Sequence, residues 1–149
     1  MPRGSVKPRE LSGWRDRTRY GAFSMNGAGK GVAAAQIIRV PAGGVQSAQS
    51  VAVFDPAQQL WMAVPIDTAS DEIYLVLYGT GIRHRSGDQA VRCTINGMEA
   101  AVLYAGKQGS SPGLDQVNVV LPPHLGAGIA SIAITVDGTA SNTVTIAIK

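Results

Sequence analysis

The chain has 149 residues with a formal net charge of +3; 45% of its residues are hydrophobic and only 15% are charged. This length suits a single domain with a substantial core, and the high apolar content and low net charge exclude disorder for most of it. Eighteen glycines and many β-branched residues favour strands and turns over helices.

Most of the net charge lies in the first 19 residues. They hold six Lys or Arg and two acidic side chains, which gives +4, whereas residues 20–149 hold seven basic and eight acidic side chains, which gives −1. We interpret residues 1–19 as a flexible basic N-terminal arm. Its arginines, with Trp14 and Tyr20, fit contacts to phosphates and bases, but Gly, Ser and Pro dilute the charge, so nucleic-acid binding is not favoured.

Two further classes of protein are disfavoured. No stretch approaches the roughly 18 uninterrupted apolar residues of a membrane-spanning helix, so no span is expected. No apolar segment follows the basic N-terminus, so no signal peptide is expected in the chain as written. The single cysteine excludes an internal disulfide and leaves the redox compartment open.

The domain is expected over residues 20–149, where a glycine-rich loop (20–31) precedes a series of short strands. Alternating apolar residues and turn signals predict roughly eight or nine of them, and no window has the apolar spacing of a substantial helix. This pattern is typical of an all-β sandwich. In chain order the strands span 32–40, 50–55, 60–66, 72–82, 91–95, 99–106, 116–122, 130–138 and 142–149.

Four local patterns support these assignments. Residues 72–82 are apolar on both faces, which predicts a central strand. Residues 91–95 alternate, with Cys93 on the inward face. The Asn-Gly pair at 96–97 is a strong hairpin signal. The Pro-Pro pair at 122–123 ends a strand, because proline lacks the ladder donor, and lets the chain cross to the opposite sheet.

Several of these segments also resemble a known family. The stretches YLVLYGTGIR, TINGMEAAVLYAG, GLDQVNVVLPPHL and VDGTASNTVTIAI resemble the immunoglobulin-like domain at the C-terminal ends of large acidobacterial (Solibacter-type) secreted proteins, which is similar in turn to the IPT/TIG group. The resemblance covers residues 72–149 best, and GAFSMNGAGKGVAAAQIIRV extends it weakly back to about Tyr20. It implies an immunoglobulin-like β-sandwich in a secreted or surface context, without a catalytic motif.

Residues with reactive chemistry are sparse. Gly79-Thr80-Gly81 lacks the third glycine and the helix of a dinucleotide loop, so we interpret it as a turn or bulge. His84 and His124 are expected in exposed loops, forty residues apart, rather than around zinc, and an inward Cys93 is expected to be inert. We therefore expect no enzyme, no cofactor and no metal site.

Two groups of residues are candidates for binding. Asp115, Gln116 and Asn118 fit a ligand rim or a Ca²⁺ site made of loop oxygens, although amides on one strand face more often bond to neighbouring backbone. Trp61 and the tyrosines fit sugar stacking, but in strands core packing competes for them. The tyrosines are Tyr74, Tyr78 and Tyr104.

We therefore expect a non-enzymatic, extracellular or cell-surface structural module that mediates protein–protein contact or assembly. The alternative is an adhesion module that binds carbohydrate or another surface ligand. Low surface charge would leave strand edges open to other protein domains or to copies of the chain, for example through residues 20–40. The candidate ligand or partner surface comprises Trp61, Asp115, Gln116 and Asn118.

Overall fold

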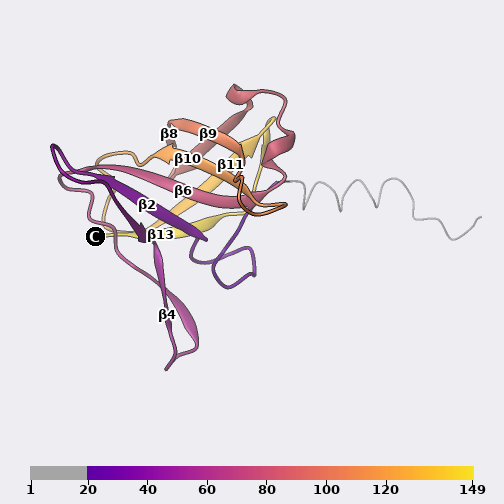
Figure 1. Cartoon of the computed structure of the whole chain (residues 1–149). Helices are drawn as coiled ribbons and strands as arrows, with labels where there is room; N and C mark the ends of the chain where they lie inside the picture. Colours follow the sequence, from indigo (N-terminus) through magenta and orange to yellow (C-terminus); the bar gives the residue numbers. More distant parts are fainter. Residues whose placement is uncertain (1–19) are drawn as a thin grey trace, which may run out of the picture.

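The computed structural model of the chain describes residues 20–149; the arm expected over residues 1–19 lies outside the described residues. The described part is all-β, with two short 3-10 turns, η1 (Ile82–His84) and η2 (Asp88–Ala90), and no α-helix. Its strands form two larger antiparallel sheets and one two-stranded sheet (Figure 1). The prediction of an all-β fold is confirmed.

The larger sheet has six strands in the order β3-β2-β6-β10-β9, with β1 also paired to β6. The apolar segment predicted to be central is β6, which pairs with β2 on one side and β10 on the other. Ile73, Leu75 and Leu77 are buried on one face of β6 and Val76 on the other, which fits a strand that is apolar on both faces. The strands are β1 (Gly21–Ala22), β2 (Ala35–Val40), β3 (Ser47–Ser50), β6 (Glu72–Thr80), β9 (Val102–Lys107) and β10 (Asp115–Val120).

The second sheet has five strands, in which β11 pairs with β7 on one side and with β12 and β13 on the other. The chain passes from β10 in the first sheet to β11 in the second through the Pro-Pro pair at 122–123, as predicted. The strands are β7 (Val91–Ile95), β8 (Met98–Ala100), β11 (Gly128–Val136), β12 (Thr139–Ala140) and β13 (Val144–Ile148).

The third sheet is a hairpin of β4 (Ala52–Asp55) and β5 (Leu60–Ala63). It was predicted around residues 56–59, and its turn follows from the sequence. The Asp55 carboxylate accepts hydrogen bonds from the backbone N–H groups of Ala57 and Gln58, and Gln59 has a φ of 55°. Figure 1 shows this hairpin as a narrow ribbon extending away from the two larger sheets.

Both larger sheets contribute side chains to one hydrophobic core. Alternation along each strand puts every second residue into it. On β7, Val91, Cys93 and Ile95 are buried whereas Arg92 is exposed, as predicted. The largest fully buried side chains include Leu75 and Leu77 of β6, Val117 and Val119 of β10, Ile132 and Ile134 of β11, and Ile146 of β13.

The strand predicted over residues 99–106 is wrong in one respect, because it divides at Ala101 between two sheets. β8 pairs with β7, and β9 pairs with β10. Ala101 is exposed between them, and its carbonyl accepts a hydrogen bond from the Val120 N–H. The apolar run from Ala100 to Ala105 continues through the division, so the sequence pattern does not reveal this change of sheet.

Gly79 is needed for a close approach of backbones, and Gly81 opens a turn. A Cβ on Gly79 would lie 2.2 Å from the carbonyl oxygen of Gly21 on β1, so a larger residue would push β1 off the sheet. Gly81 has a φ of 80° and precedes η1. The Gly-Thr-Gly segment is therefore the end of a strand and a turn.

Candidate functional site

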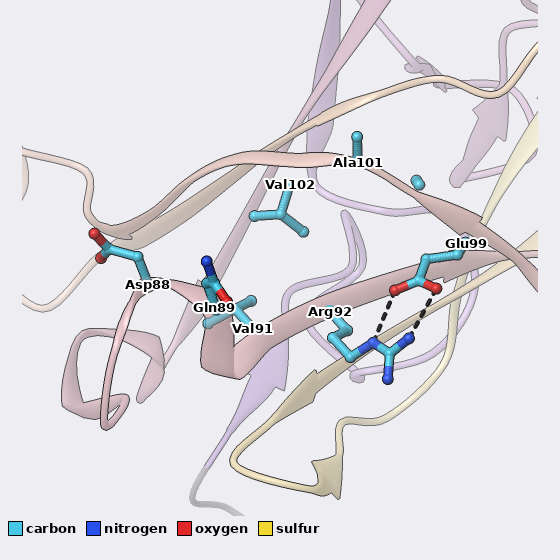
Figure 2. A pocket seen from close by; sticks show the side chains of 8 residues that line it. Asp88, Gln89, Val91, Arg92, Glu99, Ala101 and Val102 are labelled. Atoms are coloured by element: carbon cyan, nitrogen blue, oxygen red, sulfur yellow. Dashed lines mark hydrogen bonds and ion pairs between the residues drawn. The ribbon is translucent and has the colours of Figure 1, made fainter.

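A hollow lies beside β7, β8 and η2. It has a volume of about 560 Å³, and its charged lining residues are Asp88, Arg92 and Glu99 (Figure 2). Arg92 donates two hydrogen bonds to the Glu99 carboxylate, at 2.7 and 2.8 Å, and both side chains are more than half exposed. This contact raises the pKa of Arg92 and lowers that of Glu99, so both stay charged near neutral pH.

The hollow has little catalytic potential. A general acid or base needs a pKa near the working pH, and the Arg92–Glu99 contact moves both pKa values away from it. Asp88 is engaged with Arg85 at 2.8 Å. The remaining lining residues are Gln89, Val91, Ala100, Ala101 and Val102, and none of them supplies a nucleophile.

Asp115 is fully buried and holds η1 against β10. Its carboxylate accepts hydrogen bonds from the Arg83 side chain at 2.6 Å and from the Arg83 backbone N–H at 3.0 Å. Arg83 also donates to the carbonyl of Leu114. Burying a carboxylate demands such partners, and here they occupy both oxygens. The geometry supports a structural role for Asp115.

Gln116 and Asn118 lie on the opposite face of β10 from Asp115, so the three predicted site residues do not converge. The Gln116 amide donates to the Asn118 amide oxygen at 2.8 Å. They face outward on the six-stranded sheet, where Tyr104 is the cross-strand neighbour of Asn118 and Tyr78 that of Gln116. The expected bonding of these amides to loop backbone is replaced by a bond to each other.

Trp61, the fourth predicted site residue, lies on β5 in the hairpin. Phe54 is the residue opposite it on β4. The centroids of the two rings are 5.3 Å apart, and the ring planes are tilted by 60°. Such tilted pairs are favourable beyond the area that they bury. Trp61 therefore belongs to a different sheet from the polar residues of β10.

Both faces of this hairpin are apolar. Directly opposite residues of an antiparallel pair share a face, so Phe54 and Trp61 mark one face, and Val53 and Met62 the other. Four large apolar side chains of the hairpin are exposed: Val53 at 55%, Leu60 at 52%, Phe54 at 41% and Met62 at 41%. A folded domain normally turns one face of such a ribbon inward, and here neither face is covered.

The hairpin is fixed to the body only near its base. Val51 is buried and accepts a hydrogen bond from the Val64 N–H at 2.9 Å, and Ile66 is buried beside β13. Beyond these two anchors the ribbon relies on its own ladder, its turn and the Phe54–Trp61 contact. The sequence predicted the strands but not their exposure. Asp55 is the single charged residue within 40–66, and so little charge in a strand pair ordinarily indicates burial.

The remaining candidates lie apart from one another. His84 and His124 are exposed, and burial raises the pKa of the Cys93 thiol to about 12. No group of three His, Cys, Asp or Glu side chains within residues 20–149 is placed to hold a metal ion. No helix in this part of the chain is long and apolar enough to cross a membrane.

Comparison with known proteins finds no matching family model, no matching curated protein and no matching solved structure.

Proposed function

We propose that this protein is a non-enzymatic immunoglobulin-like module that makes a protein–protein contact through the β4–β5 hairpin. The single observation that carries the proposal is the exposure of large apolar side chains on both faces of that ribbon. An isolated two-stranded hairpin is at best marginally stable in water. A partner that covers it would bury apolar area and remove this weakness.

An immunoglobulin-like sandwich architecture is part of the same proposal. It is supported by two antiparallel sheets that share one core and by the crossing of the chain between them after β10. The resemblance of residues 72–149 to modules of secreted proteins supports an extracellular or cell-surface location. An accessory role beside other domains fits a hollow whose ionised side chains are each paired with an opposite charge.

Site-specific photo-crosslinking tests the contact in the cells that make the protein. A photoreactive residue in place of Leu60 should give a discrete adduct, and Phe54→Ser in the same chain should reduce its yield, because the partner would lose its apolar anchor. The control places the same probe at Leu103, which is 59% exposed on β9. Adducts of equal yield from both positions, or none from Leu60, would contradict the proposal.

Binding of a neutral glycan is a second candidate, favoured by the outer face of the six-stranded sheet. Tyr74, Tyr78 and Tyr104 point to this side of β6 and β9, together with the amides of Gln116 and Asn118. Aromatic faces with nearby amides are the groups that a sugar polymer contacts. A hydrogen bond to the Glu72 carboxylate raises the pKa of Tyr74, so that phenol stays neutral at physiological pH.

Affinity gel electrophoresis separates this candidate from the first. Neutral polysaccharides in the gel should retard the wild-type protein, and Tyr104→Ala should restore its mobility, since Tyr104 is the most exposed of these rings. Phe54→Ser is the control, because it alters the hairpin and leaves the sheet face intact. Mobility that no polysaccharide changes would contradict glycan binding.

A further inference from the structure

We infer that the partner of the hairpin is a second copy of this chain, in a two-fold dimer formed by the β4–β5 hairpin and the free edge of β3. This inference rests on the proposed contact function and names its partner. A two-fold interface uses the same patch on both molecules, so the patch must be complementary to itself. Three features of this patch are relevant to that requirement: the free edge of β3, the charge of the patch and its exposed area.

β3 is an edge strand without the usual protection. It pairs with β2 on one side only, and all four of its residues, Ser47–Ser50, are exposed. Edge strands normally carry a charge, a proline or a bulge that blocks pairing with another chain. The β3 sequence Ser-Ala-Gln-Ser has none of these, and Val51 connects it directly to β4.

A comparable edge in the other sheet is covered. The side of β13 away from β11 is occupied by bridges to Val32 and Ile66, with hydrogen bonds from Thr145 N–H to Gly31 and from Ile66 N–H to Ala147. The chain thus closes one edge with its own loops and leaves β3 open. Residues 20–40, proposed from the sequence to add to a neighbour's sheet, pair with β6 of their own chain instead.

The charge of this surface favours a copy over a partner of opposite charge. A single charged side chain, Asp55, occurs in the whole segment 40–66, which contains β3 and the hairpin. In a two-fold dimer a charge in the patch needs an opposite charge in the same patch as its partner, and a nearly uncharged patch avoids that requirement. A patch evolved for an oppositely charged protein would carry more charge than this.

The exposed area is of the right order. The four hairpin side chains expose roughly 350 Å² of apolar surface, nearly half of the ~800 Å² that each partner buries in a standard interface. The β3 edge and Val45, which is 89% exposed, lie in the same segment and add to it. The hairpin alone is too small for a stable dimer, so the proposed interface requires β3 as well.

The backbone indicates which N–H groups of β3 are free. The Val51 N–H donates to the Ala35 carbonyl on β2, and alternate residues of a strand point their backbone groups to the same side. The Gln49 N–H therefore faces β2, and the Ala48 N–H faces outward. Ala48→Pro removes an outward donor and leaves the ladder to β2 intact, because proline is tolerated on a free edge.

Sedimentation analysis of the full chain across the micromolar range tests the dimer. The wild type should shift from monomer to dimer with concentration. Phe54→Ser with Leu60→Ser, and separately Ala48→Pro, should each weaken association by about tenfold or more. Leu103→Ser, which removes an exposed apolar side chain from the opposite edge of the sheet, should dimerise like the wild type. Thermal melts establish that each variant is folded.

The outcomes separate this inference from the contact function. A wild type that stays monomeric, while Leu60 crosslinks to another protein in cells, overturns the second copy and leaves the contact function standing. A monomer without any crosslink overturns both. A dimer lost with the serine variant but kept by Ala48→Pro overturns the role of β3. A dimer that survives both changes overturns the proposed interface.

Discussion

The two larger sheets and the β4–β5 hairpin are built from the same period-two sequence pattern, yet they end in opposite environments. On β11, Ile132 and Ile134 are buried, and the residues that alternate with them face outward. On the hairpin, both sets of alternating residues are apolar, and Val53, Phe54, Leu60 and Met62 remain exposed. Alternation therefore builds a strand, but the partner surface decides whether the apolar residues are covered.

This difference separates residues that stabilise the fold from residues available for contact. The sheets derive their stability from one shared core, which removes large apolar side chains from water. The hairpin contributes little to that core beyond its anchors, Val51 and Ile66. A change in the sheets should therefore reduce stability, whereas the same change in the hairpin should reduce association.

The largest expected effect tests this separation directly with one substitution at two places. Ile134→Lys should lower the free energy of unfolding by at least about 3 kcal/mol, because it buries an unpaired charge. Leu60→Lys should change it by no more than about 0.5 kcal/mol, since the new side chain is solvated and faces Asp55 across the hairpin. Urea denaturation at a concentration where the protein is monomeric measures both, and equal losses would refute the comparison.

A second pair of variants compares two aspartates that each accept two hydrogen bonds. Asp115 is fully buried, and Asp55 lies at the hairpin turn. Asp115→Ala should lower the free energy of unfolding by about 2–3 kcal/mol, because the side chain and the backbone N–H of Arg83 both lose their acceptor. Asp55→Ala should cost about 1 kcal/mol or less, since water replaces the lost acceptor. A larger loss from Asp55 would mean that the hairpin turn supports the whole fold.

The sequence predicted much of the body because there local pattern and tertiary environment agree. Strands such as β6, β7 and β11 combine alternation with turn signals at their ends, and each was predicted near its observed bounds. β3 was missed because its residues are small and polar, and its pairing to β2 uses backbone groups that leave no side-chain pattern. The division at Ala101 was missed because apolar residues continue through it from Ala100 to Ala105.

The candidate site was less predictable, since it depends on contacts between residues distant in the chain. The Arg83–Asp115 pair joins residues 32 positions apart, and no spacing rule links them. Gln116 and Asn118 share a face, as period two requires, but that same rule puts Asp115 on the other face. Exposure of the hairpin depends on what packs against it, which the sequence of the ribbon does not encode.

The buried thiol makes the free energy of unfolding depend on pH. Burial raises the pKa of Cys93 from an ordinary 9.0 to about 12. Above pH 9 the unfolded chain loses the thiol proton and the folded chain keeps it. Stability from this group is therefore full below about pH 9 and falls as pH rises towards about 12, by up to ~1.4 kcal/mol per pH unit.

Urea denaturation of the wild type and of Cys93→Ala above pH 9 isolates the contribution of the thiol to the pH dependence of stability, because every other group titrates in both proteins. The difference between the two free energies should change with pH only above about 9. A thiol reagent sharpens the comparison of regions: Cys93 should react only on unfolding, whereas Leu60→Cys in the Cys93→Ala background should react at once in the folded protein. Rapid modification of folded Cys93 would contradict its burial.

The smallest expected effect tests whether burial or mere proximity to the core determines stability. His84 is exposed on η1, directly after Arg83. His84→Ala keeps the backbone bond from His84 N–H to Gly81 and should change the free energy of unfolding by no more than about 0.5 kcal/mol. Arg83→Ala, one residue earlier, should cost clearly more, because it leaves the buried Asp115 carboxylate without its cation. Thermal melts at neutral pH distinguish the two. Similar losses would mean that η1 acts as a unit and that exposure is a poor guide to stability in this part of the body, which would weaken the inference from exposure in the hairpin as well.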